Sequence, residues 1–239
     1  MEHAAAQQQR FVADAAHELR SPLTALRTQL EISLAHPHTT DWPDATRQSL
    51  AATRRLQELA DDLLFLARPD RDRERTALVD IASLARELAT ELRTGRPPAP
   101  TLTVHAPPTA PVHGNALQLA RLLRNLLNNA VRHAHTTVTV TVEALDAAGT
   151  TDGTLRIRVH NDGSPLAPAD RERIFERFTR LDEARSRDAG GSGPGLALAR
   201  EIATRHNGRL YVEPTASGAT FTAGLPGTPH FPAPSAVGM

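Results

Sequence analysis

The chain has 239 residues, enough for one large domain or two small ones, and with only 3% aromatic residues its core must rely on Leu, Val, Ile and Ala. Its 27 basic residues balance its 27 acidic ones, so it lacks the positive excess typical of nucleic-acid-binding proteins, and the absence of cysteine excludes disulfides and thiolate zinc sites. Because the sequence contains neither a run of about 18 apolar residues nor a signal peptide, we expect a cytoplasmic fragment without membrane contact.

Two long helices are predicted at the N-terminus. Apolar side chains repeat at spacings of four and three in the first, the heptad pattern of a helix packed against others, and predict a helix over residues 4–35. The loop HPHTTDWPD follows, with Thr40 or Asp41 as the N-cap and Pro43 in the first turn of a second helix that reaches residue 67. A lone hairpin leaves much of each apolar stripe bare, so we expect two copies to form a dimeric four-helix bundle.

The charged segment RPDRDRERT marks a domain boundary, after which the pattern becomes mixed. The fold class expected is α+β, with helices on one face of a mixed sheet. Three domains follow: the hairpin (1–69), the mixed domain (70–226) and a proline-rich tail expected to be disordered (227–239). The elements predicted in the mixed domain are helices at 80–93, 115–134 and 196–206, strands at 101–105, 110–113, 138–143, 154–159, 209–212 and 219–224, and a loop at 179–192.

His17 lies outside the heptad stripe of the first helix. If Ala16 and Leu19 face the seam, His17 points outward, and Ser21 follows one turn later on the same face. Pro22 lacks the N–H that would bond to the carbonyl of Glu18, which loosens the helix at this point. An outward histidine is most often an ordinary surface residue, so its meaning depends on the rest of the chain.

Three later segments contain residues of types that can bind a metal ion, a nucleotide base or a phosphate. In the helix LARLLRNLLNNAVRHA, Asn125 and Asn129 share a face and can hold a hydrated magnesium ion or phosphate oxygens, unless they are simply solvated. The segment VHNDGSPL ends a predicted strand and is either a plain turn or part of a pocket for a nucleotide base. The glycines of GGSGPGLALAR lead directly into a helix, and bare N–H groups at a helix N-terminus bind phosphate.

In this order the motifs resemble the kinase core of two-component sensor histidine kinases. HELRSP is similar to the phosphoacceptor box, NLLNNA to the asparagine box and NDG to the first glycine box. IFERF at 174–178 is similar to the phenylalanine box, GGSGPGLALAR to the second glycine box and SGATF at 217–221 to the last motif. The resemblance covers residues 10–225, and six motifs in family order are specific where one is not. It implies a Bergerat-type (GHKL) α/β sandwich that binds ATP and Mg²⁺, placed behind the dimerising hairpin.

The resemblance also implies an activity, protein-histidine kinase. His17 would accept the γ-phosphoryl group of ATP and pass it to an aspartate on the receiver domain of a response regulator. Glu18 would hold the tautomer of the imidazole and accept its proton. Ser21 stands where the family often has a threonine or asparagine that assists dephosphorylation of the regulator. The implied partners are a second copy of the chain and the regulator, with no nucleic acid, and the full-length protein would lie in the bacterial cell membrane.

For the nucleotide, the resemblance implies that Asn129 binds magnesium and that Asn125 is its companion one turn earlier. Arg177 and Arg180 lie near the lid and either meet phosphates or stay solvated. The other residues implied in nucleotide binding are Arg132, His133, Asn161, Gly163, Gly191, Gly193, Gly195, Leu196 and Thr220.

Three positions depart from the family pattern. Asn161 stands where an adenine-binding aspartate is common, and Asp162 beside it either compensates or does not. Pro165 replaces the second glycine of that box, and Pro194 replaces a leucine; proline has no N–H to donate. These departures leave open a degenerate core that acts as a dimeric docking or phosphatase module. A Bergerat-fold ATPase of the chaperone or mismatch-repair type is a further alternative, against which the heptad hairpin argues.

Overall fold

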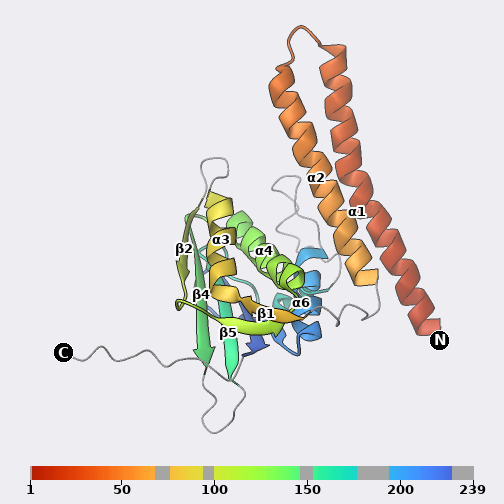
Figure 1. Cartoon of the computed structure of the whole chain (residues 1–239). Coiled ribbons are helices and arrows are strands. Elements are labelled where there is room, and N and C mark those ends of the chain that lie inside the picture. The colour runs from red at the N-terminus through yellow and green to blue at the C-terminus, as the bar shows by residue number, and fades with distance from the viewer. Residues whose placement is uncertain (1, 68–75, 94–99, 146–152, 177–193, 228–239) are drawn as a thin grey trace. The chain divides into compact units, whose positions relative to one another are not determined.

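The structure, a computed structural model, describes residues 2–67, 76–93, 100–145, 153–176 and 194–227. The described residues form two units: a helical unit that contains residues 2–67, and an α+β unit that contains residues 76–176 and 195–227 (Figure 1). None of the helices in these described ranges is long and apolar enough to cross a membrane. The predicted lid loop at 179–192 and nearly all of the predicted tail fall outside the described residues.

The helical unit is a hairpin of α1 (Glu2–Ala35) and α2 (Trp42–Ala67). Of the two predicted N-caps, Thr40 and Asp41, it is Asp41 that caps the second helix, because its carboxylate accepts a hydrogen bond from the N–H of Asp44 at 3.1 Å. Leu59 and Leu63 are buried, whereas Leu23 is 59% exposed and Leu30 is 42% exposed. A single hairpin therefore leaves part of the heptad stripe uncovered, although α1 continues unbroken through Pro22.

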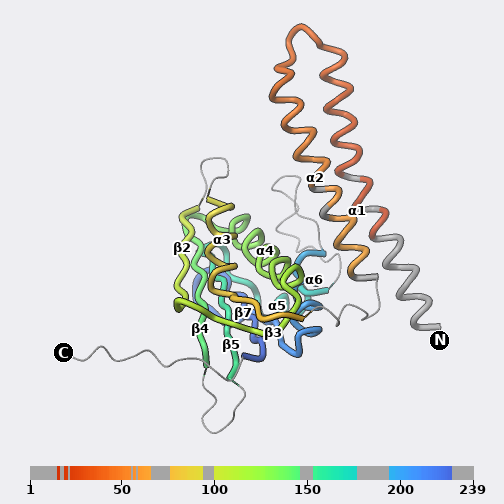
Figure 2. The backbone as a smooth tube through the Cα atoms, viewed as in Figure 1, coloured from red at the N-terminus to blue at the C-terminus, as the bar shows by residue number. Residues whose placement is uncertain are grey.

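The α+β unit is built on a mixed five-stranded sheet, as predicted. Its strand order is β2-β4-β5-β7-β6; β2 and β4 are parallel, and the other neighbouring pairs are antiparallel. Side chains alternate between the two faces, and one face buries Val138, Val140, Ile157 and Val159 completely. The strands are β2 (Thr101–His105), β4 (Thr137–Leu145), β5 (Thr154–Asn161), β6 (Arg209–Glu213) and β7 (Ala219–Pro226), with the path of the chain shown in Figure 2.

A second, two-stranded sheet joins β1 (Ala77–Asp80) to β3 (Pro111–Gly114) in antiparallel register. The sequence pattern predicts a helix that includes Asp80, but β1 ends at Asp80 and α3 (Ile81–Arg93) begins after it. The carboxylate of Asp80 accepts hydrogen bonds from the N–H groups of Ala82 at 3.1 Å and Ala110 at 2.7 Å, and from the hydroxyl of Ser83 at 2.6 Å. Burial alone would raise the pKa of Asp80, but these bonds together lower it.

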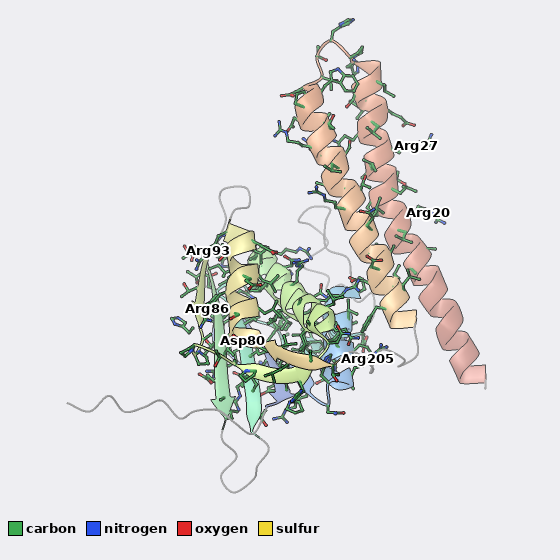
Figure 3. The ribbon with its side chains drawn as sticks, viewed as in Figure 1. Arg20, Arg27, Asp80, Arg86, Arg93 and Arg205 are labelled. Carbon is green, nitrogen blue, oxygen red and sulfur yellow. The ribbon has the colours of Figure 1, made fainter. Side chains whose placement is uncertain are left out.

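Helices α3 and α4 (Ala116–His133) lie over one face of the five-stranded sheet (Figure 1). Two arginine side chains of α3, labelled in Figure 3, donate hydrogen bonds to neighbouring backbone carbonyls. Arg93 donates to the carbonyl of Leu102, and Arg86 donates to three successive carbonyls at 106–108. The short helix α5 (Asp170–Arg173) and α6 (Pro194–Arg205) complete the unit.

Candidate nucleotide site

The helix α4 carries the two asparagines on a face that the core leaves free. Asn115 caps its N-terminus, where its side-chain oxygen accepts from the N–H groups of Leu117 at 3.1 Å and Gln118 at 3.2 Å. The core face buries Leu119, Leu122, Leu123, Leu126 and Leu127 at 0–1% exposure. Asn125 and Asn129 remain half-buried one turn apart, so they lie on the same face of the helix.

Asn125 contacts the start of α6. A Cβ atom added to Gly195 would lie 3.2 Å from Oδ1 of Asn125, so the second glycine box lies against the asparagine box. The Nδ2 group of Asn125 is buried and has no acceptor among the described residues. An unmet buried donor costs about 1–3 kcal/mol, and a ligand that brings an oxygen acceptor would remove that cost.

The loop after β5 lies against the other end of α4. A Cβ atom on Gly163 would stand 1.9 Å from the carbonyl oxygen of His133, so no side chain fits at this position. Asn161, only 1% exposed, accepts a hydrogen bond from the N–H of Gly163 at 3.1 Å and donates to the carbonyl of Ala219 at 3.5 Å. The NDG segment is thus joined to both α4 and β7, with the amide of Asn161 at the junction.

Asp162 does not take the place of the missing aspartate. Its carboxylate accepts hydrogen bonds from the N–H groups of His135 at 2.9 Å and Thr136 at 3.0 Å, and from the hydroxyl of Thr136. The hydroxyl of Thr136, followed by the backbone N–H groups, holds the pKa of Asp162 well below its usual range. Both of its oxygens are therefore engaged where α4 connects to β4, away from the amide of Asn161.

Arg132 and His133 lie in the last turn of α4. Desolvation of the imidazole, and then the positive charge of Arg132, lower the pKa of His133. The ring is therefore neutral at neutral pH, so one ring nitrogen can donate a hydrogen bond and the other can accept one.

Thr220 is not brought to the same face of the sheet as Asn161. Asn161 pairs with Ala219, and successive strand residues point to opposite faces, so Thr220 faces away. The hydroxyl of Thr220 lies 2.9 Å from Nδ1 of His160, the residue that pairs with it across the strands. Ala219 occupies the strand position opposite Asn161, and it was not among the predicted site residues. The signal that could have found it is the alternation of strand residues between the two faces of the sheet.

Several predicted site residues lie outside the described part of the chain. His17, Glu18 and Ser21 belong to α1, but their side chains are not described. The predicted lid residues Arg177, Arg180, Gly191 and Gly193 lie in 177–193, outside the described residues. Pro194 begins α6, where its missing N–H removes no helical hydrogen bond, and Leu196 is half-buried in the same turn. Pro165 is exposed in the loop beyond Gly163.

The described residues contain no group of three His, Asp or Glu side chains placed to hold a metal ion. The amide oxygen of Asn129 is a hard donor on this face of α4, one turn from the unmet N–H donor of Asn125. Such a donor set fits a magnesium ion that takes its remaining ligands from phosphates and water.

Comparison with known proteins agrees with this arrangement. Residues 7–72 match the His Kinase A (phospho-acceptor) domain, and residues 114–229 match the family described as histidine kinase-, DNA gyrase B-, and HSP90-like ATPase. This chain belongs to the sensor histidine kinases. The second match identifies the α+β unit of this kinase core as an ATP-binding domain.

The relatives include the sensor histidine kinases CusS and CpxA of Escherichia coli K12. The kinase core is 34% identical to CusS over 92% of the chain and 45% of CusS, and 36% identical to CpxA over 86% of the chain and 44% of CpxA. It therefore spans less than half the length of these two relatives. Among solved structures, the Acinetobacter baumannii histidine kinase AdeS shares the fold, with a TM-score of 0.68 at 21% identity over 88% of this chain and 97% of AdeS.

Proposed function

We propose that the α+β unit binds ATP and that the γ-phosphoryl group is transferred to a ring nitrogen of His17. The bond between the γ-phosphorus and its bridging oxygen breaks, ADP leaves, and a phosphorus–nitrogen bond forms. The phosphoryl group then passes to an aspartate carboxylate on the receiver domain of a response regulator, which returns His17 to its starting state. The observation that carries the proposal is the unmet buried amide of Asn125 against Gly195, beside Asn129.

Different residues of α4 and of the segments next to it would bind different parts of the nucleotide. Asn161 would accept from the amino group of adenine through its amide oxygen, which already faces the N–H of Gly163. Asn125 would donate to a phosphate oxygen, Arg132 would add positive charge, and His133 would bind as a neutral ring. Asn129 would hold magnesium, whose charge, when it is bound, neutralises the phosphates.

The phosphoacceptor chemistry belongs to α1. A neutral imidazole is needed for attack, and Glu18 next to His17 would accept the ring proton as the new bond forms. Ser21, one turn later on the helix, would orient a water molecule in the reverse reaction on the phosphorylated regulator. Gly191 and Gly193 of the lid would offer backbone N–H groups to the phosphates.

Two copies of the hairpin would pair. The exposed Leu23, Leu30 and Leu64, at 59%, 42% and 55%, supply apolar area that a second hairpin can cover in a four-helix bundle. We expect a dimer in solution at micromolar concentration, measured by light scattering, and a monomeric mass would contradict this part of the proposal. The full-length protein would lie in the bacterial cell membrane, with this core in the cytoplasm.

The test is incubation of the chain with γ-labelled ATP and magnesium, beside His17→Gln and the matched control His36→Gln. His36 is an exposed histidine just beyond α1, so its loss should leave labelling intact. We expect acid-labile, base-stable label on the parent chain and on His36→Gln, and none on His17→Gln. Label that persists in His17→Gln would refute the assignment of the phosphoacceptor.

Asn161 in place of the common aspartate favours one second candidate, a degenerate core that docks or dephosphorylates a regulator. An amide binds adenine without the charge that a carboxylate would bring to the bond. Absence of label from a folded, dimeric parent chain would point to this candidate. It would then be tested by nucleotide binding and by the rate at which the chain dephosphorylates a regulator.

A further inference from the structure

His206 joins the far ends of the two helices that carry the nucleotide residues. Its Nε2 atom accepts a hydrogen bond from the backbone N–H of Asn115 at 3.1 Å, and its Nδ1 atom lies 2.8 Å from the carbonyl oxygen of Ile202. Because a carbonyl can only accept, the hydrogen bonds assign the donor proton to Nδ1 and the acceptor role to Nε2. The imidazole therefore connects the end of α6 to the residue that caps α4.

The sequence at the end of α6 holds this ring in place. Asn207 has a left-handed φ of 55°, Gly208 donates to the carbonyl of Ala203 at 2.8 Å, and Asn207 donates to that of Thr204 at 3.0 Å. These bonds close the helix in a Schellman motif, with Arg205 as its last residue and His206 as the C-cap. On the other side, a Cβ atom on Gly114 would lie only 2.7 Å from Cδ2 of His206, so the glycine before the cap allows the close approach.

The second contact between α6 and α4 lies at the residues proposed to bind the nucleotide. Gly195 at the start of α6 packs on Asn125, and His206 at its end binds Asn115. Asn115 and Asn125 are about 15 Å apart along α4, and Gly195 and His206 are about 16 Å apart along α6. The equal spacing lets both contacts form at once between helices that run in opposite directions, so the two contacts set both the position and the angle of α6 on α4.

We propose that His206 is a positioning residue for the nucleotide site. By fixing the cap of α4 to the end of α6, it holds Asn125 and Asn129 at the distance from the start of α6 that the phosphates require. This inference rests on the proposed function. It adds a residue with no contact to the nucleotide, whose effect is transmitted along the two helices.

The experiment compares three variants at a temperature where each is folded. His206→Phe keeps an aromatic ring but removes the acceptor, His206→Gln places an oxygen near the position of Nε2, and His113→Phe changes an exposed histidine of β3 as the control. We expect His206→Phe to raise KM for ATP on the order of tenfold, the effect of one lost hydrogen bond, with kcat changed by less than about threefold. His206→Gln should recover most of the loss, and His113→Phe should behave as the parent.

A purely structural role would lower the melting temperature of His206→Phe but leave KM of the folded protein unchanged, and that result would overturn the proposal. Equal KM values for the Phe and Gln variants would overturn it as well. The side-chain amide signals of Asn125 and Asn129 in ¹⁵N spectra, recorded without nucleotide, test the inference even if the parent chain accepts no label. We expect His206→Phe to shift both signals, and unchanged signals would refute the positioning role independently of the kinase activity.

Discussion

Gly163 offers the sharpest single test of the geometry at the end of α4. In Gly163→Ala the new Cβ atom would meet the carbonyl oxygen of His133 at 1.9 Å, about 1.5 Å short of the 3.4 Å at which ordinary contact begins. The obstacle is backbone, so the loop after β5 must move away from α4. Forcing extra volume into packed structure costs about 1–3 kcal/mol. The move also strains the hydrogen bond from Gly163 to Asn161, worth about 1 kcal/mol.

The free energy of unfolding of the α+β unit should therefore fall by about 2–4 kcal/mol. A unit of this size loses about 2–4 °C in melting temperature per kcal/mol, so we expect a drop of about 4–16 °C by calorimetry. The matched control is Gly153→Ala, whose Cβ atom would lie at an ordinary 3.7 Å from the carbonyl of Leu145. ATP affinity should also fall in Gly163→Ala, because Asn161 shifts with the loop. Equal melting temperatures for the two variants would refute the close approach of Gly163 to His133.

Three further predictions address separate parts of the chain. His17→Gln should abolish labelling by γ-labelled ATP and leave ATP affinity unchanged in calorimetric titration; a loss of binding would contradict the separation of the two units' roles. Asn129→Ala should abolish magnesium-dependent ATP binding, and normal turnover in this variant would refute the metal assignment. Asp162→Asn should lower the melting temperature near pH 7. The pKa of Asp162 is lowered in the folded protein, so its ionised carboxylate stabilises the fold at any pH above its ordinary pKa of 3.8. This stabilisation is lost as the pH falls through the lower pKa of the folded protein. The difference in melting temperature between Asp162→Asn and the parent should therefore shrink below about pH 4. A difference that grows on acidification would contradict this account.

The sequence predicted the long elements well because the signals that form them are local. The helix expected at 115–134 is observed at 116–133, with Asn115 as its cap, and the strand expected at 101–105 has those same bounds. The strand at 77–80 was missed because it is only four residues long and forms through pairing with 111–114, more than 30 positions later. Asp80 was placed in the helix for the same reason: its side chain caps the helix, and one of its oxygens binds Ala110.

In the candidate site, too, local motifs predicted some residues, and the tertiary structure decided the placement of others. The motifs alone predicted roles for Asn125, Asn161, Gly163 and Gly195, and the structure places Gly195 against Asn125 and Gly163 against His133 at the end of α4. Thr220 was also expected there, but strand phase decides which of two neighbours faces Asn161, and a one-residue shift reverses the face. Whether Asp162 replaces the missing aspartate was likewise undecided until both of its oxygens were found on residues 135–136.

The sequence by itself determined the long helices, the strands of the five-stranded sheet and the order of the motifs that identify the family. Periodicity, caps and glycine positions act over a few residues, so they can be read without knowing the fold. The tertiary structure alone decided that Gly163 lies on His133, that Gly195 lies on Asn125 and that His206 binds Asn115, a residue 91 positions away. Such contacts depend on how closely two backbones approach once the whole core has packed, and no local pattern specifies that distance.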